Sequence, residues 1–520
     1  MTNQFEKYQF PKEKFELIGS ERTLKDVKLD TKPVGYFKDA FMRFSRNKAS
    51  VVAAIIILVL VLFAIVGPFC GHQSYTEAYK TDNTIINYKY LLPKLSFMEG
   101  TGIWDGTKKE EVSLNKLNIY RAMEEEMNAN VLVDILNEET TVDAFGKEST
   151  LYTVRIDSYR ALDVKRMTLT ADEYAALQQW QDETGIQVIL PRVNNEVVDK
   201  NPSVWFQCDR KGNAILDKDG NFLPAYYTAK DGYPDDYTSS VRLASDPYNE
   251  GDMDGAYRYA QRTGSAGKYN YVVRVNSYNY FTYKYGEEPS FIFGTNEKGY
   301  DIFTRLASGA RFSFLLAVFV SVINLFIGAI YGAIEGYYGG TIDILMERVS
   351  DILGGIPFMV VTTLFNLHLA SKVGVVPALL FAFVLTGWLG MAARVRMQFY
   401  RFKNQEYVLA ARTLGAKDFR IMFKHIFPNS LGTIITGSVL VIPGVIFSET
   451  SLSYLGIINL DSSTMSSIGA MLSAGQGSMT HSPHVVLFPA LFIALLEISF
   501  NLFGNGLRDA FNPSLRGVEE

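Results

Sequence analysis

The sequence has 520 residues and a formal net charge of −5, which gives no reason to expect a nucleic-acid partner. Its mean hydropathy of +0.04 is the average of two different kinds of sequence. Residues 49–69 and 312–507 contain long apolar runs, whereas residues 72–290 are polar and rich in tyrosine, Asp, Asn, Lys and Gly. The change in composition predicts a domain boundary at each end of the polar block.

The N-terminal region, residues 1–48, ends in an amphipathic segment. Tyr36–Phe44 places three phenylalanines on one helical face beside two basic residues. Aromatic and basic residues in this arrangement favour a helix that lies in the membrane interface. We therefore expect an interfacial helix that leads into the first apolar run.

Six apolar stretches are long enough to cross a hydrocarbon core about 30 Å thick, which takes about 20 helical residues. Together they carry one acidic residue, Glu497, and no other Asp, Glu, Lys or Arg. Buried helices of a soluble protein do not explain six runs of this length. The predicted fold is an α-helical polytopic membrane protein with six transmembrane helices: Ala49–Phe69, Phe312–Ile334, Ile352–Ala370, Val373–Ala393, Ile426–Ser448 and Val485–Leu507.

The orientation follows from the basic residues beside these stretches. Lys and Arg cluster before the first stretch and between the fourth and fifth, whereas residues 449–484 contain none. Because basic loops remain in the cytoplasm, this predicts that both termini are cytoplasmic. Residues 72–290 would then be extracellular, on a multi-pass protein of the cell membrane surrounded by lipid.

The polar block, residues 72–290, is long enough to bury a core of its own. A capping-box pattern at Thr170 opens a predicted helix, which is followed by a predicted strand at Ile186–Leu190. The similar segments YTVRIDSY (152–159) and YVVRVNSY (271–278) alternate as strands do, and they are either paired strands or a remnant of duplication. We expect an inserted α+β domain.

Apparent metal motifs in the sequence are weak. The turns DKDGN (217–221) and DMDG (252–255) resemble parts of a calcium loop, but in the first the sixth position, a glycine in EF-hands, is Phe222. His481 and His484 lie in a polar loop, where histidines are usually solvated. No nucleophile–base set and no phosphate-binding loop stands out. The sequence therefore predicts no metal, no cofactor and no catalytic residue, and so not an enzyme.

The most informative segment is EYVLAARTLGAKDFRIMFKHIFPN, residues 406–429. Gly415 is expected to end a first helix in the left-handed conformation. Asp418 is expected to cap a second helix, Phe419–Phe427, which ends at Pro428. Taken alone, these features fit either a docking surface or a plain helical hairpin. Small and basic residues surround the glycine: Ala410, Ala411, Arg412, Lys417, Arg420 and Lys424.

This segment resembles the cytoplasmic signature loop of ABC importer permeases. In that family a small-residue pair precedes a glycine and, thirteen residues later, a proline; Ala410, Ala411, Gly415 and Pro428 occupy these positions, while Leu409 replaces the usual acidic residue. Further segments resemble the second permease of oligopeptide, dipeptide and nickel importers, in the same order along the chain: 294–311, 336–357, 387–396, 449–456 and 504–513.

The resemblance implies the type I ABC importer permease fold, with 291–516 as the permease core and 405–429 as the loop that docks on the ATPase. It implies a homologous second permease, two cytoplasmic ATPase subunits and an extracellular substrate-binding protein as partners. The implied function is ATP-driven import of oligopeptides, and nickel or another small solute is the alternative. A membrane-anchored receptor or adhesin built on 72–290 would need one anchor rather than six.

Two further expectations concern recognition. Glu497 and Asn501, one helical turn apart in the last stretch, are predicted to face the pathway or a subunit interface, because an intramembrane carboxylate is costly without a partner. The inserted domain is expected to contact the substrate-binding protein, with tyrosines as the recognition residues: Tyr226, Tyr227, Tyr257, Tyr259, Tyr278 and Tyr280.

Overall fold

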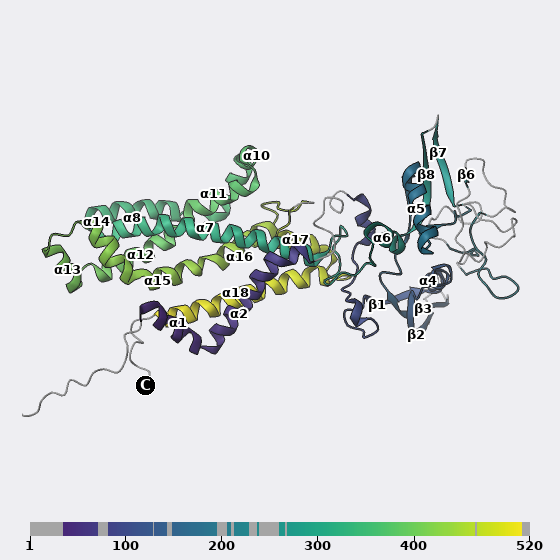
Figure 1. Cartoon of the computed structure of the whole chain (residues 1–520), viewed down its shortest axis with the longest axis horizontal. Coiled ribbons are helices and arrows are strands. Elements are labelled where there is room, and N and C mark those ends of the chain that lie inside the picture. The colour runs from purple at the N-terminus through teal and green to yellow at the C-terminus, as the bar shows by residue number, and fades with distance from the viewer. Residues whose placement is uncertain are drawn as a thin grey trace, which may run out of the picture.

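The computed structural model describes residues 35–70, 82–127, 129–142, 148–194, 205–209, 213–227, 237–238, 259–265, 268–462 and 465–511. The molecule is elongated, with a bundle of helices at one end and a domain of sheets and helices at the other (Figure 1). Helices α13 and α14 lie at the tip of the bundle farthest from the sheets. The turn predicted at 252–255 and Tyr257 lie outside the described residues.

The bundle contains α1 and α2 from the N-terminal part of the chain and all helices after residue 301. Their bounds are α1 Tyr36–Arg46, α2 Lys48–Val66, η2 Gly67–Phe69, α7 Ile302–Tyr338, α8 Gly340–Gly354, α9 Phe358–His368, α10 Ala370–Val373, α11 Val375–Gly387, α12 Leu389–Phe402, α13 Glu406–Thr413, α14 Asp418–Arg420, η7 Ile421–Ile426, α15 Phe427–Val439, α16 Val441–Tyr454, α17 Ile468–Gly475, η8 Gln476–Ser478 and α18 His484–Phe511. The predicted interfacial helix at Tyr36–Phe44 falls within α1.

Five helical segments are long and apolar enough to cross a membrane among the described residues. They contain or largely cover five of the six predicted stretches. The remaining one, Ile352–Ala370, is divided between the end of α8 and α9, which has 11 residues and is too short to span alone. Gly354, Gly355 and Pro357 interrupt the helix there. The five long segments are Lys48–Phe69, Ile302–Tyr338, Val375–Phe402, Asp418–Tyr454 and His484–Phe511.

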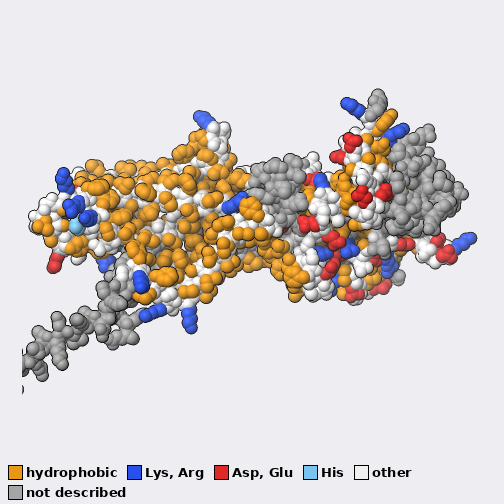
Figure 2. Space-filling model, viewed as in Figure 1, with side chains coloured by type: hydrophobic (Ala, Val, Ile, Leu, Met, Phe, Trp, Pro, Cys, Tyr) orange, Lys and Arg blue, Asp and Glu red, His pale blue; other side chains and the backbone are white. Residues whose placement is uncertain are grey.

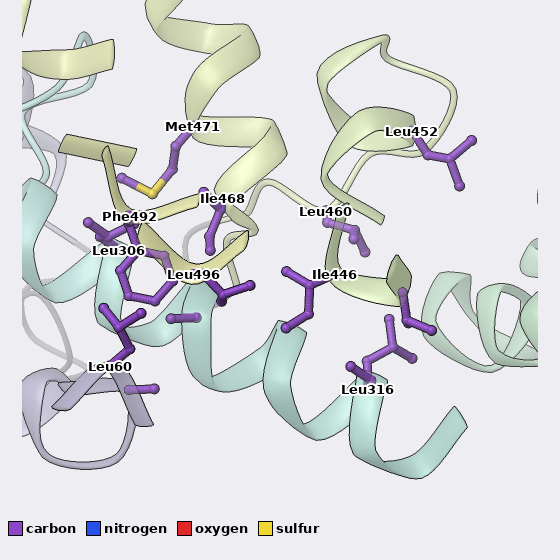
Figure 3. Packing of buried hydrophobic residues seen from close by; sticks show 14 of the residues in the cluster. Leu60, Leu306, Leu316, Ile446, Leu452, Leu460, Ile468, Met471, Phe492 and Leu496 are labelled. Carbon is purple, nitrogen blue, oxygen red and sulfur yellow. The ribbon is translucent and has the colours of Figure 1, made fainter. Parts of the chain in front are cut away.

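One hydrophobic core joins α2, α7, α16, α17 and α18. Figure 3 shows Leu60, Leu316 and Ile446 in this cluster together with Phe492 and Leu496 of α18. The side chains come from segments that are far apart in the sequence, so the cluster holds the two ends of the chain in one bundle. These buried residues are large and aliphatic or aromatic, which is the composition of a close-packed interior.

Helices α7 and α12 pack closely against each other in the bundle. Gly328, Gly332 and Gly336 follow one another at four-residue spacing on the face of α7 that meets α12. A Cβ on Gly332 would lie 2.1 Å from the carbonyl oxygen of Ala392, a distance at which no side chain fits. Glycine at this position therefore sets the distance between the two helices.

The inserted domain consists of two βαββ units of the same topology. The first has the sheet order β1-β3-β2, and the second has the order β4-β8-β7-β6, with β5 also paired to β8. In each unit a helix follows the first strand, and the last strand lies between the first strand and the strand that precedes it in the sequence; the second unit has two further strands, β5 and β6. The bounds are η3 Asn83–Tyr88, η4 Ser96–Met98, β1 Thr107–Ser113, α4 Leu114–Met127, β2 Leu132–Val142, β3 Glu148–Asp157, β4 Val164–Thr170, α5 Ala171–Thr184, β5 Ile189–Leu190, β6 Tyr237–Thr238, β7 Ala260–Ser265, β8 Lys268–Asn276 and α6 Ser277–Tyr285.

The two similar sequence segments are the last strands of these units, β3 and β8. They belong to different sheets, so the alternative that they pair with each other is wrong. Their ends are alike in detail: Asp157 accepts a hydrogen bond from the backbone N–H of Tyr159, and Asn276 accepts one from that of Tyr278. Equivalent strands with equivalent terminal caps support the duplication instead. Of the strand predicted at Ile186–Leu190, only the last two residues form a strand, β5.

The predicted capping box at Thr170 is present. The Thr170 side chain accepts a hydrogen bond from the backbone N–H of Glu173, and the Glu173 carboxylate accepts one from that of Thr170. Four of the six tyrosines predicted to recognise a partner are buried, so the prediction is wrong for them. Tyr226, Tyr259 and Tyr280 belong to the buried core of the second unit, and Tyr278 is buried at the domain's base. Their rings pack the domain itself, because an aromatic ring buries more apolar area in a small core than it gains at a surface.

The domain is fixed to the bundle through a polar and aromatic base. Asp82 accepts hydrogen bonds from Lys284 at 2.6 Å and from Tyr285 at 2.5 Å, which closes the domain's first and last segments onto each other. Asp461, in the connection between α16 and α17, binds Arg305 at 2.5 Å and also pairs with Lys298. The base of the inserted domain is therefore attached to the bundle through the connection between α16 and α17 as well as through its covalent links to α2 and α7.

Candidate functional site

Helix α13 ends in the way that its sequence predicts. Gly415 has φ +80°, the left-handed conformation that glycine adopts without a steric penalty. Its N–H donates to the carbonyl of Arg412, and the N–H of Ala416 donates to the carbonyl of Ala411 at 3.1 Å. This pattern of hydrogen bonds satisfies the last carbonyls of the helix and fixes the direction of the turn.

The second half of the segment differs from the prediction in two respects. Asp418 does not cap a helix; its carboxylate accepts a hydrogen bond of 2.7 Å from the hydroxyl of Tyr337 at the end of α7. Pro428 does not end a helix either. It lies in the first turn of α15, directly after the π-helical turn Ile421–Ile426. The wider turn before the proline accommodates a residue without an N–H, so the helical path continues.

The turn between α13 and α14 exposes a group of apolar side chains, which we call the tip cluster. Leu414 is 88% exposed and Phe419 is 71% exposed, and the ring of Phe419 packs on that of Phe423 with centroids 4.6 Å apart. Leu409 is also exposed. Four basic residues surround the cluster (Figure 2 shows blue side chains gathered at this tip): Arg412, Lys417, Arg420 and Lys424.

The predicted site residues divide into an exposed set and a buried one. Ala410, Arg412, Gly415 and Pro428 are exposed, whereas Ala411 is buried, at 9% exposure. Arg412 also lies 5.9 Å over the ring of Tyr337. Ala410 and Arg412 lie on α13 and Gly415 follows its end, whereas Pro428 lies in the first turn of α15. The tip cluster itself was not identified from the sequence, although the spacing of Phe419 and Phe423 on one helical face was a usable signal.

The tip is attached to the bundle by apolar packing. Val408, Ile421 and Ile426 are fully buried and belong to a core cluster with Tyr337 of α7 and Phe399 of α12. The exposed apolar side chains therefore stand on a base that is itself well packed. An exposed apolar surface on a rigid support is typical of a protein interaction site.

Next to this base, Arg396 of α12 joins α8 to the bundle. Its guanidinium donates to the carboxylates of Asp343 at 2.7 Å and Glu347 at 2.8 Å, and Glu335 of α7 lies 3.5 Å away. Tyr400 donates a further hydrogen bond to Asp343. The hydrogen bonds from Arg396 lower the pKa of Asp343 below its usual value, so this carboxyl is ionised at neutral pH.

Besides Glu335 of α7, the apolar helices α16 and α18 contain Glu449 and Glu497. Glu497 of α18 is partly buried, and its Oε1 atom has no hydrogen-bond partner among the described residues, while Asn501 is exposed. Glu449 of α16 is fully buried and accepts hydrogen bonds from Ser313 at 2.8 Å and Ser453 at 3.0 Å. Glu449 is therefore satisfied within the chain, whereas Glu497 is not.

The two histidines considered as metal ligands have other contacts. The Nε2 atom of His484 lies 3.3 Å from the carbonyl oxygen of Thr295, and the ring of His481 packs against Tyr90. The described residues contain no group of three or more side chains arranged to hold a metal ion. Both rings serve the packing of the domain's base against α18.

Two family profiles match the bundle. One, described as the binding-protein-dependent transport system inner membrane component, matches residues 324–517. The other, the N-terminal TM domain of oligopeptide transport permease C, matches residues 35–93.

Individual relatives agree with these profiles. The oligopeptide transport system permease protein OppC of Bacillus subtilis is 43% identical over 224 residues, which cover 43% of this chain and 72% of the relative. The chain belongs to the oligopeptide and dipeptide permease family. The dipeptide permease DppC of the same organism is 42% identical, over 43% of this chain and 69% of the relative. OppC of Escherichia coli K12 is 37% identical, over 44% of this chain and 74% of the relative. The chain is thus a transport permease component and a multi-pass membrane protein with an inserted α+β region.

Proposed function

We propose that this permease forms half of the pathway through which an ATP-driven importer carries oligopeptides. In this proposal it pairs with a homologous second permease and receives peptide from an extracellular substrate-binding protein. The observation that carries the proposal is the tip cluster, an exposed apolar surface framed by basic residues at the end of the bundle farthest from the inserted domain (Figure 1). A short helical segment with exposed apolar side chains can bind in a groove on a separate ATPase subunit.

The proposal fixes the orientation of the chain. An ATPase that hydrolyses cellular ATP lies in the cytoplasm, so the tip cluster is cytoplasmic and the inserted domain is extracellular. The distribution of Lys and Arg supports the same orientation. The substrate-binding protein then docks at the end of the bundle that carries the inserted domain.

The experiment introduces a charge into the tip cluster. Phe419→Asp should abolish co-purification of the ATPase subunits and uptake of labelled oligopeptide, while the amount of permease in the membrane stays normal. Leu455→Asp is the matched control, because Leu455 is also exposed, at 59%, but lies next to Gly456 beyond the end of α16. If the ATPases co-purify normally with Phe419→Asp, the docking role of the tip is wrong.

Glu497 gives a second test, of the contact with the other permease. A buried carboxylate oxygen without a partner inside the chain is costly in an apolar helix, so a group from outside the chain is expected to satisfy it. Glu497→Gln should keep co-purification with the second permease, and Glu497→Leu should lose it. Loss of uptake in Glu497→Gln with normal assembly would instead place the residue in the pathway, together with Asn501.

A further inference from the structure

The inserted domain carries one short, ordered loop beside the bundle, which we call the base loop, residues 95–104. A β-bridge between Lys94 and Asp105 closes it. Inside the loop the N–H of Leu95 donates to the carbonyl of Trp104 at 2.7 Å, and the Asp105 carboxylate accepts from the N–H of Gly102 at 2.8 Å. These hydrogen bonds give the loop a defined conformation.

The base loop exposes large apolar side chains. Phe97 is 83% exposed, Ile103 is 61% exposed and Trp104 is 37% exposed. The loop has a single charged residue, Glu99, which pairs with Lys94 at 3.6 Å. An ordered loop of a soluble domain would normally present polar residues to water, so this composition indicates a partner that is not water.

Trp104 has a strained backbone conformation, and its ring is held by contacts with the bundle side of the domain. Its φ is +54°, in a region that residues with side chains rarely adopt. In this conformation the indole Nε1 donates to the carbonyl of Ile292 at 2.5 Å, and the ring lies 5.9 Å from that of Phe488. Strain of this kind persists where the surrounding contacts require it.

The contact with Phe488 places the base loop beside the first turns of α18. This helix is long and apolar enough to span a membrane, and Phe293 stacks on Phe488 at 4.1 Å. Helix α2, whose outward side chains Leu62 and Ile65 are exposed, packs against α18. Hydrophobic side chains continue from the bundle onto the near end of the inserted domain (Figure 2).

We propose that Phe97, Ile103 and Trp104 insert into the lipid headgroup region of the leaflet on the inserted-domain side. Tryptophan, phenylalanine and aliphatic side chains favour burial at the boundary between headgroups and acyl chains, and the carbonyl of Ile292 already satisfies the Trp104 indole N–H. The lipid is favoured over a protein partner because the apolar surface is continuous with the outward faces of the spanning helices. The contact gives the inserted domain a second attachment, which fixes its tilt relative to the bilayer.

The test measures the depth of the base loop in a bilayer. The full chain, with Cys70 and Cys208 replaced by Ser, receives a single cysteine at Phe97 or Ile103 and is reconstituted into phosphatidylcholine and phosphatidylglycerol nanodiscs. A nitroxide on that cysteine is then probed with oxygen, which concentrates in lipid, and with a water-soluble nickel chelate. The matched control is a cysteine at Val133, an aliphatic residue of β2 that is 48% exposed.

We expect the labels at 97 and 103 to be several-fold less accessible to the nickel chelate than the label at 133, and more accessible to oxygen. Brominated lipid should also quench the tryptophan fluorescence of the parent chain more than that of Trp104→Phe. Equal nickel accessibility at all three positions would overturn the proposal. Protection that appears only when the second permease or the substrate-binding protein is added, without quenching by brominated lipid, would overturn it in favour of a protein contact.

Discussion

Replacing Gly415 by alanine isolates the contribution of one backbone angle to the proposed docking of the ATPase. No atom lies within 4 Å of the position that a Cβ would occupy, so the substitution creates no clash. The φ of +80° remains, and a left-handed residue with a side chain costs about 1–2 kcal/mol. A difference of this size changes an equilibrium constant about 5- to 30-fold, so the population of the turn that presents Leu414 and Phe419 should fall by up to this factor.

The assay is the equilibrium binding of purified ATPase subunits to the permease in nanodiscs, together with peptide uptake in proteoliposomes. Gly415→Ala should weaken binding by up to this factor, and Gly415→Val should weaken it further because a β-branched residue is less tolerant of positive φ. The matched control is Gly456→Ala. Gly456 has φ +71° and equally open surroundings, but it lies at the other end of the bundle.

This comparison separates general strain from a specific effect on docking. Both alanine variants should lose similar stability, but only Gly415→Ala should lose ATPase affinity. If Gly456→Ala weakens ATPase binding as much as Gly415→Ala does, the effect is general destabilisation. If neither variant changes the affinity, the left-handed turn is not required for docking, and the reasoning from φ is refuted.

Three further predictions concern other parts of the chain. Arg396→Gln removes the guanidinium that joins three helices and should lower the melting temperature in detergent by the equivalent of about 3 kcal/mol, since each charge-assisted hydrogen bond contributes roughly 1.5–3 kcal/mol; an unchanged melting temperature would contradict this. Burial by itself raises the pKa of Asp82, but hydrogen bonds from Lys284 and its neighbours lower it below 3.8 overall, so this stabilisation is complete above that pH and is lost below it. Limited proteolysis should therefore show the inserted domain opening as the pH falls below about 4, and Asp82→Asn should remove that dependence. Replacing residues 92–286 by a short Gly/Ser linker should leave the bundle inserted and reduce ATP hydrolysis stimulated by the substrate-binding protein several-fold; unchanged stimulation would assign the domain another role.

The membrane-spanning stretches were predictable because hydrophobicity is a local property of the sequence. The predicted stretch that the structure divides, Ile352–Ala370, contains residues that interrupt helices. Gly354, Gly355 and Pro357 lie inside the apolar run, between α8 and α9. An average over twenty residues hides such a break, because glycine and proline change the backbone without making the segment polar.

The tip was predictable only in part, for a related reason. Gly415 acts locally, through its own φ, and the sequence identifies it correctly. The outcome at Pro428 depends on the preceding turn, which widens into a π-helix over Ile421–Ile426 because buried residues hold it in place. The contacts between Arg396 and Asp343 join positions 53 residues apart, so no local pattern reveals them.

One helical path runs from the tip cluster toward the opposite end of the bundle. Residues Asp418–Tyr454 form one helical segment of 37 residues, which at 1.5 Å per residue is about 55 Å long. It begins at the tip cluster, and its far end leads into the connection that holds Asp461, to which Arg305 and Lys298 bind. Lys298 lies in the segment that leads from the inserted domain into α7, so this helical segment connects the tip cluster with the base of the inserted domain. The regular hydrogen bonding changes at two places on this path, the π-helical turn at Ile421–Ile426 and Leu440 between α15 and α16, so these are where we expect the helix to bend.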